Sequence, residues 1–521
     1  MKHKLLLLSF ISFCLELSGQ TFSEDVADII YTHCANCHRK GEIGPFPLTT
    51  YEEVKNRANS IRFVVESRYM PPWKADQNYQ HYQNENFLEA SEIQKIISWV
   101  DAGTPQGNPA NEPALPNFPT GSQVGTPDLV LSFTQSYVHK GNNRDEYRYF
   151  VLPTGLTEDK ELIALEMRPG NAKIVHHTLL WADATGLAKI EDEKSSEYGF
   201  SGGGSVGFLG DQLPGFVPGQ KPNLFPPGMS QRVPKGSDLV LQMHYAPSSI
   251  DQSDSSTVNL FFAKQASKRT VFNKIMLPTE LVNGPFVMPP ESVKTFHGVY
   301  KVPIDVSLLG IWPHCHMLGK KWEVYAKLPN GDQIPLIKID DWDFNWQGAY
   351  YFNKLIVLPK GSEVHGFATY DNSSNNPVNP NIPPKYVTWG EGTSDEMYYL
   401  PLSYVLYQPG DENLILDAEL LEDDGPFSRF SQSGISAIYP NPAVGKVNVD
   451  FVLNKTQKIK LDLKDLLGNT LYNIINPASY YQGQHQIEYK LPDDIPSGFY
   501  MIELQTQDII LSQKLLIKKE N

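Results

Sequence analysis

Histidine and methionine residues in four separated places of the chain could bind a transition metal. In chain order they are His176 and His177 in "IVHHTLLW", His244 in "LQMHYAP", His314 and His316 in "WPHCHMLGK", and Met397 in the polar loop "GEGTSDEMYY". Neutral imidazole and thioether groups suit copper, and a thioether favours Cu(I). Zinc sites more often include carboxylates or thiolates. Each residue alone is compatible with ordinary core packing, but together they favour copper.

A separate motif near the N-terminus predicts covalently bound haem. Cys34, Cys37 and His38 in "THCANCHRK" form the pattern C-x-x-C-H. In this pattern two thiols form thioethers with the haem vinyl groups, and the adjacent histidine ligates the iron. The alternatives are a redox dithiol or half of a zinc site, but no second cysteine pair follows in the chain.

The haem iron needs a further axial ligand, which we expect to be Met70 in "SRYMPPW". The rival ligands are His33 and His81. Histidine and methionine ligation raises the reduction potential relative to histidine alone, which suits electron transfer.

Helical periodicity predicts a small all-α cytochrome c domain over residues 20–103. In its last helix, "SEIQKIISWVDAG", we expect a capping box between Ser91 and Gln94 and an end at Gly103. A proline-rich segment, residues 104–127, follows as a semi-extended linker.

Length, charge and the first residues bound the remaining possibilities. A chain of 521 residues is too long for one core, at roughly 150 residues per domain. Its net charge of −15 and the lack of a basic run argue against a nucleic-acid partner. Residues 1–19 have the pattern of a secretory signal peptide, with Cys14 inside it. No later apolar run is long enough for a transmembrane segment, so we expect an exported protein, secreted or at the cell surface.

Residues 128–420 alternate short β-branched and aromatic runs with turn residues, which predicts antiparallel β-sandwiches. The length suits two of them, over 128–270 and 271–420. Adjacent residues of a regular strand point to opposite faces. His176 and His177 can therefore bind one metal together only if a bulge or loop lies there.

The four metal motifs, in their order, resemble the copper type II, ascorbate-dependent monooxygenases, which include the peptidylglycine α-hydroxylating and dopamine β-monooxygenases. The resemblance covers about 128–410 and implies two jelly-roll-like β-sandwiches with two copper ions. It implies that the electron-transfer copper is held by His176, His177 and His244. It also implies that the oxygen-activating copper is held by the catalytic residues His314, His316 and Met397.

The cysteine between His314 and His316 has two interpretations. In a strand the two histidines share one face while Cys315 points to the other, where it packs as a small apolar residue. A multicopper oxidase would use the cysteine as a ligand and place another histidine four residues after the second one. Lys320 occupies that position, so we favour the packing role.

Two departures from the copper family affect the expected structure and substrate. Tyr398 and Ala368 stand where mammalian members have a disulfide, so we expect the fold without it. Trp312 stands where the peptide-hydroxylating enzyme has an arginine that grips the substrate carboxylate. We therefore expect an apolar or aromatic substrate instead of a C-terminal glycine.

The segment 432–521, with "IYPNPAVGKVNVDF" and "IPSGFYMIEL", resembles the C-terminal sorting domain of type IX secretion in Bacteroidetes. The resemblance implies a small β-sandwich that interacts with the secretion machinery. An ordinary adhesion or binding module is the alternative.

These motifs together lead us to expect a haem-fused dicopper monooxygenase. Its partners would be a small organic substrate, O2 and an external electron donor to the haem. The alternative is a surface electron-transfer or copper-binding protein without turnover. The glycine-rich stretch 198–230 could be a lid over the site or a structural surface loop.

Overall fold

The computed structural model describes residues 19–83, 85–116, 122–124, 126–201, 210–264, 267–416, 433–453, 457–480 and 483–519. The predicted signal peptide, with Cys14, therefore lies outside the described residues apart from Gly19, as do parts of the proline-rich linker and of the glycine-rich stretch. The chain divides into two compact units. A helical unit contains residues up to Trp73 and Asn86–Phe118, and a β unit contains Lys74–Glu85 and the chain from Pro119 onward.

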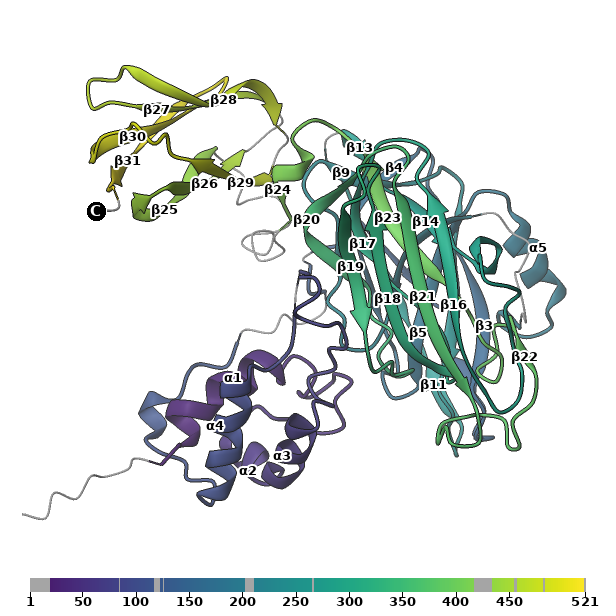
Figure 1. Ribbon diagram of the computed structural model, residues 1–521. Coiled ribbons are helices and arrows are strands. Elements are labelled where there is room, and N and C mark those ends of the chain that lie inside the picture. The colour runs from purple at the N-terminus through teal and green to yellow at the C-terminus, as the bar shows by residue number, and fades with distance from the viewer. Residues whose placement is uncertain are drawn as a thin grey trace, which may run out of the picture. The chain divides into compact units, whose positions relative to one another are not determined.

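The helical unit is a small group of helices around one apolar core (Figure 1). Its elements are η1 (Phe22–Val26), α1 (Ala27–His33), α2 (Tyr51–Lys55), α3 (Ala58–Glu66), α4 (Ala90–Asp101) and η2 (Pro109–Asn111). Ile61 and Val65 of α3 and Ile96 and Trp99 of α4 are spaced to share one helix face, and all four are buried in this core.

The N-terminus of α4 differs from the prediction. The helix begins at Ala90, and Glu89 and Glu92 form the capping box, with the Glu89 N–H donating to the Glu92 carboxylate (2.8 Å). The predicted Ser91 lies within the first turn, and Gln94 instead donates to Ser98. The cap lies two residues earlier than predicted, and Ala90, a strong helix former, becomes the first residue of the helix.

The expected domain over residues 20–103 is interrupted in the structure. Lys74–Glu85 lies with the β unit, although Trp73 and Asn86 on either side of it belong to the helical unit. We call this segment the strap. Its Tyr82 pairs with Phe352 of a β strand and is almost fully buried.

Two sheets form the first part of the β unit. One contains β1 (Leu129–Ser132), β12 (Thr257–Phe262), β4 (Lys160–Arg168), β9 (Met229–Val233), β13 (Arg269–Thr270) and, beside β4, β8 (Asn223–Leu224). The other contains β6 (Phe200–Ser201), β3 (Glu146–Pro153), β10 (Asp238–Tyr245), β5 (Val175–Asp183) and β7 (Asp211–Phe216). Side chains from both sheets, such as Leu165 and Leu241, pack in one core. The helix α5 (Leu187–Lys194) and the short pair β2 (Tyr137–His139) and β11 (Gln252–Asp254) complete this part.

The next strands also lie in two main sheets, and neighbouring strands within each sheet are antiparallel (Figure 1). One path begins β14 (Phe272–Met276), β23 (Leu400–Leu406), β17 (Val306–Ile311), β20 (Tyr350–Leu358) and β24 (Leu414–Ile415). The other is β16 (Ser292–Lys301), β21 (Glu363–Asn372), β18 (Gly319–Lys327) and β19 (Gln333–Ile339). The short elements are η3 (Pro278–Glu280), β15 (Val287–Met288), β22 (Val387–Thr388) and η4 (Asp411–Asn413).

A buried ion pair joins the end of the first group of strands to the second. Arg269 donates from both terminal nitrogens to the two carboxylate oxygens of Asp411, at 2.7 Å each. The side chains are only 2% and 0% exposed. Ser307 also donates to Asp411 (2.6 Å), so the buried charge is well supplied with partners.

The C-terminal strands form a further β module with its own core. They are β25 (Gly434–Val444), β26 (Lys446–Leu453), β27 (Gln457–Lys464), β28 (Thr470–Tyr480), β29 (Gly483–Lys490), β30 (Gly498–Gln505) and β31 (Ile510–Ile517).

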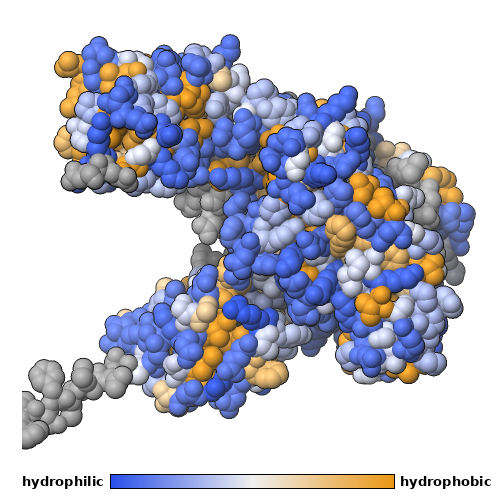
Figure 2. All heavy atoms as spheres, viewed as in Figure 1, coloured by the Kyte–Doolittle hydropathy of each residue, from blue (hydrophilic) through white to orange (hydrophobic). Residues whose placement is uncertain are grey.

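On the face drawn in Figure 2, hydrophobic residues form separate patches among polar ones. The several sheets confirm a protein of mostly β structure with more than one β module.

Candidate metal centre

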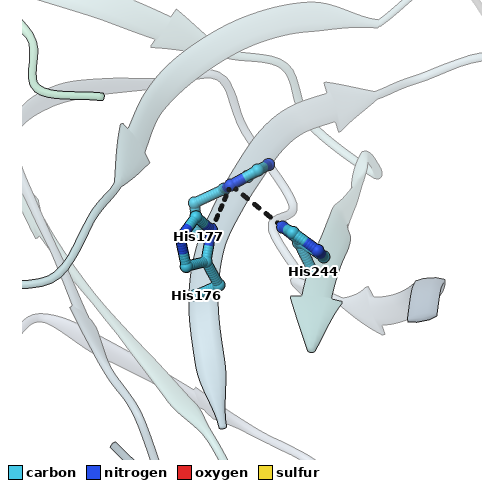
Figure 3. Close-up of side chains that lie close together, drawn as sticks. All are labelled: His176, His177 and His244. Carbon is cyan, nitrogen blue, oxygen red and sulfur yellow. Dashed lines mark hydrogen bonds between the residues drawn. The ribbon is translucent and has the colours of Figure 1, made fainter. Parts of the chain in front are cut away.

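Three histidines from two neighbouring strands meet at one end of the β3–β10–β5 sheet (Figure 3). His177 Nδ1 lies 3.2 Å from His176 Nδ1 and 3.3 Å from His244 Nδ1. One ligand atom from each of the three lies within 4.8 Å of the other two, so a single ion could bind all three rings.

A β-bulge allows the two consecutive histidines to converge. His244 pairs with His177, but the next residue, Tyr245, pairs with Val175, so His176 is the extra residue of β5. In a regular strand His176 and His177 would point to opposite faces. The bulge that the sequence required for joint binding is therefore present.

Burial keeps these imidazole rings neutral. It lowers the pKa of His176 to about 3, helped by the neighbouring His244. It also lowers the pKa of His177 well below its usual value, and that of His244 despite the opposing effect of Asp145. The buried Nε2 atoms of His176 and His244 form no hydrogen bond with the described residues. A neutral imidazole ring can offer a nitrogen lone pair to a metal ion, and the three converging Nδ1 atoms are placed to do so.

Two residues of the β3 region orient His244. The Tyr147 ring stacks on the His244 ring with centroids 4.2 Å apart and planes 7° apart. A carboxylate oxygen of Asp145 lies 3.6 Å from His244 Nε2, and the Thr393 hydroxyl donates to the same oxygen. Tyr147 and Thr393 are also hydrogen-bonded (3.0 Å), so the loop that leads to Met397 is attached to the environment of His244.

His314 and His316 lie in the connection between β17 and β18, and not in a regular strand as the alternation argument assumed. His314 pairs through a single bridge with Tyr399, and the His314 and His316 ring centroids are 5.2 Å apart. Met397 lies two residues before Tyr399, and its backbone N–H and that of His316 donate to the same Glu396 oxygen. Burial lowers the pKa of His314 well below its usual value and that of His316 to about 4.

The side chain of Cys315, the residue between the two histidines, is buried in the core beside Trp322. The Trp322 indole N–H donates to its sulfur at 3.2 Å. A Cβ atom on Gly319 would lie 2.2 Å from the same sulfur, so glycine is required there by close approach. This position agrees with the predicted packing role of Cys315.

Glu396 ties the His314–His316 connection to the Met397 loop. Its side chain is fully buried, and its carboxylate accepts the backbone N–H groups of His316, Leu318 (3.0 Å) and Met397 (2.8 Å). Burial raises the pKa of Glu396 to about 8, and these N–H groups oppose the rise. The carboxylate therefore fixes the backbone on both sides of the metal motif.

The two histidine groups, which the sequence assigns to separate sandwiches, lie against each other. The His177 and His314 ring centroids are 6.0 Å apart. The Phe344 ring stacks on His176 (5.3 Å, 21°) and lies 5.9 Å from His316. It is also 6.1 Å from His244. Sequence reasoning missed Phe344, Glu396 and Asp145, because nothing in their local pattern distinguishes them from core or surface residues.

The C-x-x-C-H motif directly follows α1 in the helical unit. The N–H groups of Cys37 and His38 donate to the Cys34 carbonyl at 3.2 and 2.9 Å. His38 Nδ1 lies 3.0 Å from the Phe46 carbonyl, which leaves Nε2 as the ring atom available for iron. Both cysteines are free and partly buried, and the surrounding protein raises the pKa of both thiols. This donor set fits haem c.

The structure separates the three candidates for the other axial position. Met70 follows α3 in the helical unit and is partly buried. His33 has partners for both ring nitrogens, Asn86 at 2.8 Å and Glu92 at 3.6 Å. His81 lies in the strap with the β unit and is largely exposed. Met70 stays the predicted ligand.

Comparisons with known proteins identify the C-terminal module. Residues 437–518 match the secretion system C-terminal sorting domain. The comparison with curated proteins gave no match. Solved structures with some similarity include the β-D-glucuronidase of Dictyoglomus thermophilum (10% identity, 49% of this chain and 44% of that chain, TM-score 0.12). Another is the C. elegans fusion protein EFF-1 (8% identity, 76% and 91%, TM-score 0.15).

These structural similarities carry no argument about fold or function, and the chain spans less than half the length of the glucuronidase. Among the helices of the described residues, none is long and apolar enough to cross a membrane. The sorting domain implies interaction with the type IX secretion machinery and confirms the predicted destination. The C-terminal part of the chain is a secretion sorting domain, and the protein is exported to the cell surface or beyond it.

Proposed function

We propose that this protein is an exported, haem-fused copper monooxygenase that hydroxylates a C–H bond of a small organic substrate. The observation that carries the proposal is the meeting of five histidines from three distant sequence motifs, three of them buried and two partly buried. A cluster of neutral imidazoles without carboxylate ligands suits copper better than zinc.

Two sets of residues would hold two copper ions. His176, His177 and His244 supply three imidazoles. His314 and His316, with the thioether of Met397, supply the second set. When bound, copper would supply one-electron transfer and activation of O2. The hydroxylation places one oxygen atom in the C–H bond and releases the other as water, and it consumes two electrons and two protons.

The residues around the histidines have positioning roles in this proposal. Asp145 and Tyr147 hold the His244 ring, as residues in contact with metal-ligating histidines commonly do. Glu396 holds the backbone of His316 and Met397. Burial of the whole cluster excludes bulk water, which protects reactive species from side reactions.

The helical unit would supply electrons one at a time. Cys34 and Cys37 would attach haem c, and His38 and Met70 would ligate its iron. An external donor would reduce this haem, which would replace ascorbate as the reductant of the copper residues. Covalent linkage of the two units raises the effective donor concentration to roughly the millimolar range.

Trp312 bears on the substrate class. It precedes His314 by two residues and its ring lies 6.3 Å from that of Tyr351. An indole there offers an apolar surface and no cationic partner for a carboxylate. We therefore propose an apolar or aromatic substrate.

The second candidate function is copper binding or electron transfer at the cell surface without turnover. It is favoured by the free Nε2 atom of His38 and by the buried histidine triad, both of which an electron carrier also needs. O2-dependent product formation separates the two functions.

The test is metal and haem analysis followed by O2 uptake of the reduced protein with a panel of apolar and aromatic substrates. Labelled O2 should place one labelled oxygen atom in the product. His314→Ala should abolish product, whereas His297→Ala should not, because His297 lies outside the cluster and packs on Phe367 (4.0 Å). Stable copper binding with no product from any substrate would favour the electron-transfer function.

A further inference from the structure

The strap, Lys74–Glu85, is bound to the two strands that flank one loop of the β unit. The Asp76 N–H donates to the Lys338 carbonyl at the end of β19 (2.8 Å), and the Gln83 N–H donates to the Tyr351 carbonyl at the start of β20 (2.7 Å). Residues 340–349 connect these strands. The strap therefore holds both ends of this loop.

Tyr82 is the main apolar anchor of the strap. Its hydroxyl donates to the Leu336 carbonyl of β19 (2.7 Å). Its ring packs against Tyr350 and Phe352 of β20, with centroids 5.2 and 5.7 Å apart. One buried side chain thus contacts both strands, and its removal would leave a cavity beneath the loop.

Lys74 holds the loop itself. Its ammonium group lies 3.0 Å from an Asp341 oxygen and 3.9 Å from an Asp343 oxygen, and the Lys74 side chain is only 11% exposed. An ion pair with one partner so well covered is less screened than a surface pair.

The residue after Asp343 is Phe344, whose ring contacts members of both histidine groups. It stacks on His176 (5.3 Å) and lies near His244 (6.1 Å) and His316 (5.9 Å). The position of Phe344 therefore affects both groups at once.

We propose that the strap positions Phe344 over the histidine cluster, so that Lys74, Tyr82 and Phe344 are positioning residues of the metal centre. The relevance of this inference to copper chemistry rests on the proposed function. The positioning of Phe344 by the strap can be tested in the metal-free chain. The segment comes from the middle of the helical unit's sequence. The geometry of the histidines thus depends on a segment that lies, in the sequence, between the two parts of the helical unit.

The first test uses the metal-free full chain and needs no copper. Lys74→Met should speed amide hydrogen exchange in residues 340–349 by about fivefold, because the loop loses its ion pair and opens more often. Carbethoxylation of His176 by diethylpyrocarbonate should accelerate in parallel. Lys74→Arg, which keeps the cation, should restore both rates, and Lys140→Met, which removes an exposed ion pair with Asp251, should change neither.

The second test uses the copper-loaded chain. Phe344→Ala should alter the Cu(II) electron paramagnetic resonance spectrum, while Phe344→Leu should retain most of the native signal. The strap proposal would be overturned if amide exchange and His176 reactivity were unchanged in Lys74→Met and also in the double variant Tyr82→Phe with Lys74→Met. Failure of the native chain to bind copper, with the exchange effect present, would overturn the proposed function and leave the strap's role intact.

Discussion

Replacing Glu396 by glutamine tests whether one carboxylate holds the His314–His316 connection in place. Its Oε1 accepts the N–H groups of His316 and Met397, and its Oε2 accepts that of Leu318. Glutamine is nearly the same size and keeps one carbonyl oxygen. Two of these three bonds can therefore persist, while the amide NH2 group faces the Leu318 N–H.

The expected loss of stability follows from the Leu318 N–H group, which has no acceptor in the glutamine variant. One buried N–H without an acceptor costs about 1–3 kcal/mol. Glu396→Ala leaves all three N–H groups unpaired in a site that is 0% exposed. We expect about 3–5 kcal/mol for alanine, less than three separate losses, because adjacent losses are not additive.

Calorimetry of the metal-free protein measures the first effect. A loss of about 2 kcal/mol in Glu396→Gln should lower the unfolding midpoint of the β unit by about 2–3 °C, because the unfolding entropy of so large a unit is high. Equilibrium dialysis should then show that Glu396→Ala loses the copper of the His314 group before that of the His176 group. Glu323→Gln is the control, since it makes the same substitution at an exposed position of β18. Equal midpoints and copper retention in Glu396→Gln, Glu396→Ala and wild type would refute the argument.

Other variants test the remaining assignments. Replacing Cys34 and Cys37 by serine should remove covalent haem, measured as haem absorbance in the denatured protein, and should leave copper content unchanged. Met397→Ala should abolish hydroxylation, while metal analysis should still find copper at the His176, His177 and His244 site. Normal turnover in this variant would show that Met397 is an ordinary core residue. His244→Ala should slow O2-dependent reoxidation of the haem, and an unchanged rate would exclude electron relay. Arg269→Met should lower the unfolding free energy by about 3–5 kcal/mol, measured by calorimetry, because the buried Asp411 carboxylate is left without a cation.

Local sequence patterns predicted the features that depend on a few neighbouring residues. The adjacency of His176 and His177 is incompatible with joint binding from a regular strand, and this conflict predicted the bulge that the structure contains. The helical and β-rich portions of the chain also followed from periodicity. The start of α4 was misplaced because Glu89, a weaker capping residue than Ser91, takes the N-cap position.

Features that depend on distant segments could not be predicted in this way. Phe344 lies in "DWDFNWQG", which has no signal for a contact with histidines far away in sequence. The docking of the strap likewise depends on which β strands lie exposed beside it, and Tyr82 resembles any aromatic residue in a loop. The approach of His177 to His314 requires the relative position of two sheets, which hydrophobic periodicity does not specify.

The bulge in β5 separates the fold of the sheet from the grouping of its histidines. Since His176 is the extra residue, removal of that single codon would restore regular pairing between β5 and β10 and leave the remaining ladder in register. The sheet is therefore separable from the chemistry: a sandwich lacking the insertion would fold around the same core while it lost one of three imidazoles. The grouping of the three imidazoles thus depends on one inserted residue and not on the topology of the sheet.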